Sequence, residues 1–242
     1  SISPARMLSL VFANKAFVLL AVLYGVMTLA IALITAGLPF AAIYLVADQG
    51  DAALSGAAKA LSVLSLMFAS FTVGSILSQA GWVFASARLG KVGALVLGLS
   101  LYICLLFGLY GVLPSVNVTA VAGMFVLAGM TNGSYQQIPW AMYPDLMDVT
   151  RAKSGEAIEG AFSAIWLFGQ KAANAFAPLI LGAILATYGW VETTQGVADQ
   201  PVAATQALHV AITLVPAGIL AVSIVLLVVF YRPLARKALN VV

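Results

Sequence analysis

Six apolar runs, each long enough to cross a lipid bilayer, constrain this chain more than any other feature of its sequence. A transmembrane helix needs about 20 consecutive apolar residues to span the hydrocarbon core. Hydrophobic residues make up 63% of the chain and charged residues 8%, a composition outside the range of soluble globular proteins. The sequence therefore predicts an all-α membrane protein in which residues 1–242 form a single six-helix transmembrane domain. The predicted spans are 16–46, 57–84, 92–113, 118–143, 160–188 and 208–231.

The first span is longer than one bilayer thickness and contains Gly37 and Pro39. Proline removes a backbone donor and clashes with the preceding turn of a helix. We therefore expect a bend or a break of the first span at this point.

Basic residues concentrate in alternate loops of the six-span arrangement. One side holds nine of them and the other only Lys59. Because cytoplasmic loops carry an excess of Lys and Arg, this bias predicts an integral membrane protein with both termini cytoplasmic. We expect it in a bacterial inner (cytoplasmic) membrane. The nine basic residues are Arg6, Lys15, Arg88, Lys91, Arg151, Lys153, Arg232, Arg236 and Lys237.

Lys171 lies near the middle of the fifth span. At a rise of 1.5 Å per residue it is roughly 17 Å along its helix, close to mid-bilayer, where a lysine costs about 2.5 to 3.5 kcal/mol on insertion scales. Every acidic residue of the chain falls in a loop or at a helix end. A charged Lys171 therefore needs a substrate, a water-filled cavity or an acid of another polypeptide as its partner. The alternative is a lysine that snorkels to the interface.

Polar residues of the fourth and fifth spans indicate a cavity near Lys171. A structural alternative for the amides is hydrogen bonding between helices, with the close approach that Gly129 and Gly133 allow. The functional hypothesis is a substrate-binding cavity lined by Lys171, Asn174, Asn132, Gln136, Trp140 and Tyr24.

Other kinds of site have little support in the sequence. We find no nucleotide-binding loop, no metal-ligand spacing and no nucleophile triad, so the sequence does not predict an enzyme or a metal site. The single cysteine, Cys104, excludes an internal disulfide. No basic run is interleaved with aromatic residues, so we expect no nucleic-acid partner.

The segment YPDLMDVTRAKSGEAIEGAFSAIWLFGQKAANAFAPLILG, residues 143–182, contains two Asp, a Gly, a Glu-Gly pair and then a Lys. This pattern resembles the tenth-to-eleventh helix region of the glycoside-pentoside-hexuronide:cation symporters, the melibiose-permease-like branch of the major facilitator superfamily. The first run, LVFANKAFVLLAVLYG, resembles the family's entry into its seventh helix, and ARLGK resembles its basic turn between helices eight and nine. The matching positions are Asp145, Asp148, Gly155, Glu159, Gly160 and Lys171.

In one position the chain departs from that pattern. It has Ile158 where the family commonly has a basic residue before the Glu-Gly pair, and Arg151 and Lys153 could supply this charge.

The resemblance implies the C-terminal half of a twelve-helix transporter, built from two inverted three-helix repeats. It implies cation-coupled symport of sugars or other small solutes by alternating access, together with an N-terminal half that is not in this chain. No cofactor is implied, and the site of the coupling cation, Na⁺ or H⁺, is expected in the other half. A cytoplasmic gate would consist of Asp145, Asp148, Arg151 and Glu159.

Two other functions stay open at this point. One is a non-transporting structural or assembly subunit, with a transporter-like fold, in a larger membrane complex. The other is a half-size carrier that dimerises. The expected partners are the lipid bilayer, a second six-helix half or other membrane subunits, and a small-molecule substrate. Because the chain starts at Ser1 and not at a methionine, we expect a processed, trimmed or separated piece.

Overall fold

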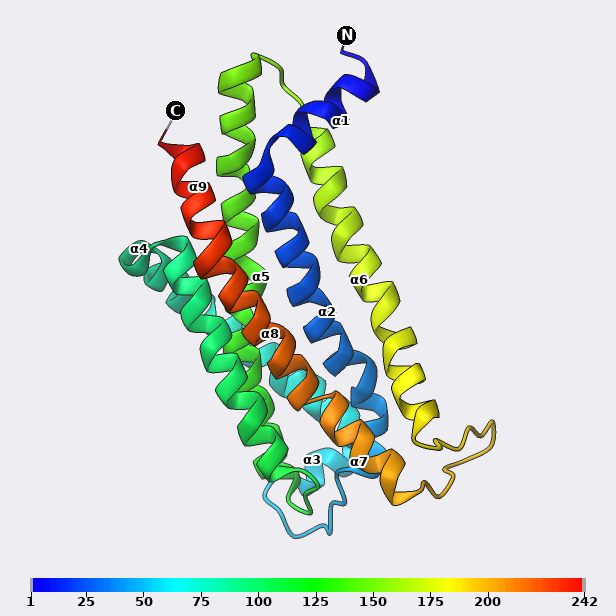
Figure 1. Ribbon diagram of the computed structural model, residues 1–242. Coiled ribbons are helices and arrows are strands. Elements are labelled where there is room, and N and C mark those ends of the chain that lie inside the picture. Colours follow the sequence, from blue (N-terminus) through cyan, green and yellow to red (C-terminus); the bar gives the residue numbers. More distant parts are fainter. Residues whose placement is uncertain (1, 241–242) are drawn as a thin grey trace.

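The computed structural model describes residues 2–240, so the ends of the predicted domain, residues 1, 241 and 242, lie outside the described part. The described residues fold into long helices that pack side by side, and both termini lie at the same end of the bundle as the connection between α5 and α6 (Figure 1). The helices are α1 (Pro4–Ala13), α2 (Lys15–Tyr44), α3 (Ser55–Leu61), α4 (Val63–Val112), α5 (Val118–Ser154), α6 (Glu159–Thr187), α7 (Val202–Ala211), α8 (Leu214–Leu226), the π-helical η1 (Leu227–Tyr231) and α9 (Arg232–Leu239).

Within residues 2–240, four helical stretches are long and apolar enough to cross a membrane. They are Lys15–Tyr44, Val63–Val112, Glu159–Thr187 and Val202–Leu239. The structure therefore supports an all-α membrane protein but does not show six separate membrane helices. The predicted spans 57–84 and 92–113 lie largely in the two arms of α4, which has 50 residues and turns at Gly90. The φ of Gly90 is 77°, a value that favours glycine.

Three features of the helices differ from the sequence-based prediction. Of the predicted bend or break at Pro39, the break is wrong, because α2 runs unbroken through this residue. The helix α5 continues eleven residues past the predicted 143, to Ser154, and ends where Gly155 takes a left-handed φ of 71°. Pro139 and Pro144 lie inside this helix without ending it, and polar side chains are compatible with a helix outside the bilayer. The last span, predicted as 208–231, starts earlier, at Val202, and is interrupted at Thr213 between α7 and α8.

Small residues bring α4 and α5 together. A methyl group added at Gly129 would collide with the backbone carbonyl of Phe71, and one added at Gly133 would collide with the hydroxyl of Ser78. The close approach that the sequence predicted at Gly129 and Gly133 is confirmed. It places α5 directly against α4.

The helix α2 is the most buried of the four apolar stretches and contributes many residues to the core. It packs against α5, α6 and α8. The helix α6 lies at the edge of the bundle, and most of its outward face is exposed in this chain. At the junction of α2, α5 and α6, buried side chains therefore lie next to exposed ones.

Candidate functional site

The hydroxyl oxygen of Tyr24, on α2, is the point where three helices meet. Trp140 of α5 donates its Nε1–H to this oxygen over 2.9 Å, and Gln170 of α6 donates its Nε2–H over 3.2 Å. Tyr24 is buried, whereas Trp140 is 37% exposed. The indole of Trp140 is therefore held in place from inside the bundle while part of it remains accessible.

Stacked aromatic rings fix the orientation of Tyr24. Trp166 of α6 stacks on it with ring centroids 4.3 Å apart and an interplanar angle of 6°. Tyr135 of α5 stacks on it at 5.2 Å and 21°, and its hydroxyl lies 2.6 Å from that of Thr28. Offset-stacked rings attract one another, and the hydroxyls of Tyr24 and Tyr135 both have hydrogen-bond partners. This cluster therefore supports the exposed groups around it.

Lys171 and Asn174 lie on the exposed side of α6, next to this cluster. Lys171 directly follows Gln170, and Asn174 donates its Nδ2–H to the carbonyl oxygen of Gln170 over 3.0 Å. Among residues 2–240 no hydrogen bond or salt bridge involves the ammonium group of Lys171. The ammonium is thus available to a partner outside the described residues.

The structure separates the other two predicted residues from this group. The side-chain oxygen of Gln136 accepts a hydrogen bond from the hydroxyl of Ser75 in α4, over 2.8 Å, so Gln136 faces α4. Asn132 is buried, and its Oδ1 has no hydrogen-bond partner among the described residues. Of the six predicted side chains, the structure brings Tyr24 and Trp140 into contact. Lys171 and Asn174 lie on the exposed side of α6 near Gln170, which bonds to Tyr24.

Sequence reasoning missed Gln170 as a member of the site. Its position directly before Lys171, in a helix with very few polar residues, was the available signal. It also did not find Tyr135 and Ser75, because their roles depend on which helices become neighbours and not on their own spacing.

Within the described residues, two salt bridges lie toward the end of the bundle that holds both termini. Lys91 approaches Asp145 with its Nζ 2.6 Å from Oδ2, and also donates to the carbonyl oxygen of Ala141 over 2.8 Å. Arg151 pairs with Glu159 over 3.2 Å. Asp148 is exposed and makes no salt bridge with a described residue. Three of the four predicted gate residues are thus divided between two pairs, one of which uses the additional residue Lys91, and Asp148 belongs to neither pair.

The described residues contain no group of three or more His, Cys, Asp or Glu side chains that could hold a metal ion. The junction and the neighbouring face of α6 contain the partly exposed indole of Trp140, the amides of Gln170 and Asn174, and the exposed ammonium group of Lys171.

The sequence matches the family described as MFS/sugar transport protein over residues 1–233. The chain belongs to this family. Membership of the MFS/sugar transport family places it among transporter proteins and not among enzymes. It also confirms the resemblance to a symporter of the major facilitator superfamily.

One curated relative in this comparison is an uncharacterized symporter of Synechocystis sp.. It is 30% identical over 131 residues, which cover 53% of this chain and 24% of the relative. The matched region thus spans about a quarter of that symporter's length.

Proposed function

We propose that this chain is the C-terminal half of a cation-coupled symporter for sugars or other small solutes. It would form six transmembrane helices arranged as two inverted three-helix repeats. The two arms of α4 would each cross the membrane, α5 would be a further crossing in spite of its polar residues, and α7 to η1 would form the last. Family membership and the likeness to a symporter support this proposal.

The observation that carries the proposal is the junction at Tyr24. A sugar has apolar ring faces that stack on aromatic side chains and hydroxyl groups that need hydrogen-bond partners. Trp140 offers a partly exposed indole that a hydrogen bond to the buried Tyr24 orients, and Gln170 and Asn174 offer amides on the neighbouring helix. Such a preorganised polar and aromatic surface is what a small polar ligand requires.

The position of Lys171 supports the proposal that a second half covers this surface. An ammonium group on a lipid-facing helix surface costs several kcal/mol, so intramembrane lysines face a bundle interior or a water-filled cavity. Its neighbours on the exposed side of α6 include Phe168 and Ala175. In our proposal this side of α6 faces the central cavity between two halves, where Lys171 binds an anionic substrate group or a carboxylate of the other half.

In this proposal the protein lies in a bacterial inner membrane, and the end of the bundle with both termini is cytoplasmic. The loops at that end carry most of the basic residues, as the positive-inside rule requires. The pairs Lys91–Asp145 and Arg151–Glu159 then lie on the cytoplasmic side, where they would form and break as the two halves rock between inward-closed and inward-open states. The coupling cation, Na⁺ or H⁺, would bind in the other half.

The test is solute accumulation by the complete protein in proteoliposomes. A panel of labelled mono- and disaccharides is offered with an inward Na⁺ gradient, an inward H⁺ gradient or neither. The proposal predicts that at least one sugar accumulates only when a cation gradient is present. Uptake equal to that of protein-free liposomes for every sugar and gradient would favour the non-transporting assembly subunit instead.

A further inference from the structure

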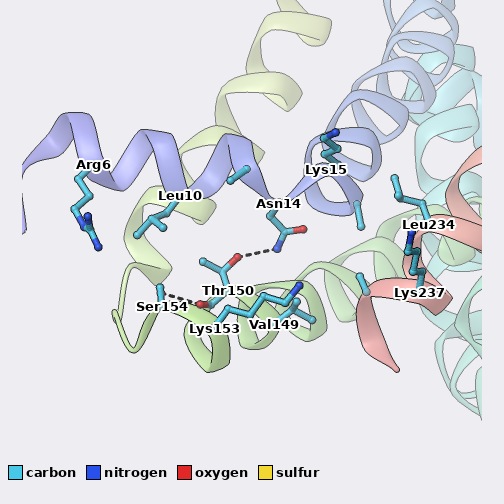
Figure 2. Close-up of a pocket in the computed structure, with 13 residues that line it drawn as sticks. Arg6, Leu10, Asn14, Lys15, Val149, Thr150, Lys153, Ser154, Leu234 and Lys237 are labelled. Carbon is cyan, nitrogen blue, oxygen red and sulfur yellow. Dashed lines mark hydrogen bonds between the residues drawn. The ribbon is translucent and has the colours of Figure 1, made fainter. Parts of the chain in front are cut away.

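A pocket of about 650 Å³ lies at the end of the bundle that holds both termini, apart from the Tyr24 junction. Its walls come from α1, the first turn of α2, the last turns of α5, and α9 (Figure 2). None of its 13 lining residues is acidic. Four of them are basic: Arg6, Lys15, Lys153 and Lys237.

The four basic side chains have no acidic partner within residues 2–240. Both salt bridges of the described chain lie elsewhere, at Lys91–Asp145 and Arg151–Glu159. Asp148 and Glu156, the acids closest in sequence to Lys153, do not line the pocket. Several unpaired cations around one cavity create a positive potential that attracts anions.

The first turn of α2 adds to this potential. Backbone N–H groups at a helix N-terminus carry partial positive charge, and acidic residues are favoured there. The helix α2 has no acid in its first turn and begins instead with Lys15. A lysine in this position is unfavourable for the helix alone, and an anion in the pocket would offset that effect.

The floor of the pocket is held by hydrogen bonds. Asn14 donates its Nδ2–H groups to the carbonyl oxygen of Leu146 over 2.7 Å and to the hydroxyl of Thr150 over 2.9 Å. Ser154 donates to the carbonyl oxygen of Thr150 over 2.8 Å. Figure 2 shows the Asn14–Thr150 and Ser154–Thr150 contacts, with Lys153 extended beneath them. These contacts fix the α1–α2 junction on α5, so a ligand meets a preformed site.

We propose that this pocket binds a phosphate group, presented by an anionic phospholipid headgroup or by a free phosphate. Lysine binds phosphate as a point charge, and arginine binds it through its planar fork. Basic pockets between transmembrane helices on the cytoplasmic side bind such headgroups. The cytoplasmic placement rests on the proposed topology, but the charge of the pocket does not.

The helix α1 gives a reason to test lipid first. Leu8 and Phe12 are 45% and 55% exposed. At 100° per residue they lie on the face of α1 opposite Arg6, which lines the pocket. An apolar face opposite a basic one is the pattern of helices that lie in a membrane interface.

The experiment measures ligand binding to the purified complete protein in detergent by native mass spectrometry. Phosphatidylglycerol, phosphatidylcholine and inorganic phosphate are titrated separately. The pocket variant is Lys15→Gln with Lys153→Gln. The matched control, Lys59→Gln with Arg88→Gln, removes two exposed charges that do not line the pocket. A contribution of about 1 kcal/mol per basic residue predicts roughly 30-fold weaker phosphatidylglycerol binding by the pocket variant.

Two results support the proposal and differ in the source of the phosphate. A preference for phosphatidylglycerol over phosphatidylcholine that the control keeps and the pocket variant loses assigns the site to a headgroup. Binding of inorganic phosphate that only the pocket variant loses assigns it to a free phosphate. Equal binding of all three ligands by the pocket variant and the control overturns the proposal.

A single substitution keeps the proposal testable if the double variant misfolds. Lys237→Gln changes one exposed residue of α9 and should weaken phosphate or headgroup binding about fivefold. If Lys237→Gln leaves the binding of every ligand unchanged while the double variant does not fold, the proposal is likewise overturned.

Discussion

Trp140 on α5 and Tyr24 on α2 are joined by a hydrogen bond of 2.9 Å from the indole N–H to the phenol oxygen, although 116 residues separate them in the chain. The bond connects an accessible side chain to a buried one. It therefore fixes the orientation of the ring on which, in the proposed function, a sugar would stack.

Replacement of Trp140 by phenylalanine keeps an aromatic ring and removes this donor. A neutral hydrogen bond contributes about 1 kcal/mol net, so we expect a small change in thermal stability. Substrate affinity should fall about fivefold, because the ring is no longer held in one orientation. The measurement is equilibrium binding of the transported sugar to Trp140→Phe.

Trp190→Phe is the control for this variant. Trp190 packs against Phe40 and Tyr44 at the opposite end of α2, with ring centroids 5.2 and 5.1 Å away. It should bind sugar like the wild type. Wild-type affinity in Trp140→Phe as well would remove Trp140 from the site.

The packing of α4 on α5 predicts a difference between two glycines of the same helix. A methyl group at Gly129 would collide with the backbone of Phe71, whereas one at Gly123 meets nothing within 4 Å. Overpacking costs about 1 to 3 kcal/mol, so Gly129→Ala should lower the melting temperature and the yield of folded protein. Gly123→Ala should change neither. Equal melting temperatures of the two variants in the same detergent would show that α4 and α5 are not so close.

The Lys91–Asp145 pair predicts an effect on rate more than on stability. Its side chains are 41% and 45% exposed, and exposed pairs contribute only about 0 to 1 kcal/mol. Asp145→Asn should therefore change the rate of transport at normal expression, and the exchange Lys91→Asp with Asp145→Lys should restore part of it. Asp148→Asn, which removes an exposed carboxylate without a salt bridge to the described residues, serves as the control. Loss of expression in Asp145→Asn would mean that the pair is structural and not part of a gate.

The proposed orientation predicts which sites a membrane-impermeant thiol reagent reaches. With the exposed Cys104 replaced by alanine, single cysteines at Ser3 and Ala238 should be labelled only from the cytoplasm. A cysteine at Gln195, in the loop between α6 and α7, should be labelled only from outside. Labelling of Gln195→Cys from the cytoplasm would rule out the six-span topology.

Hydropathy predicted where the helices lie because length and apolar character are local properties of the sequence. It placed α2 and α6 within about two residues of their ends. It could not predict that α5 continues to Ser154, because beyond the bilayer a polar helix and a polar loop have the same hydropathy. The stop at Gly155 was readable only as a helix-ending glycine.

Side-chain partners were harder to predict, since they depend on which helices become neighbours. Tyr24 and Trp140 were predicted members of one cavity and are in contact. Gln136 was expected beside them but bonds to Ser75, because its side of α5 faces α4. Lys91 was predicted only as a basic loop residue, and its pairing with Asp145 needed the turn of α4 at Gly90.

Lys171→Ala tests the central claim most directly, when complex yield and ligand binding are measured on the same preparation. If Lys171 faces a substrate cavity, the variant should insert and accumulate at least as well as the wild type, because a costly charge leaves the bilayer. Its ligand binding should be severely impaired, and Lys171→Arg should restore binding only in part, since a planar fork replaces a compact ammonium. A lysine paired with an acid of the other half predicts loss of the complex instead, because a buried unpaired acid costs about 3 to 5 kcal/mol. Full yield with unchanged ligand binding would contradict a functional role of Lys171 in either form.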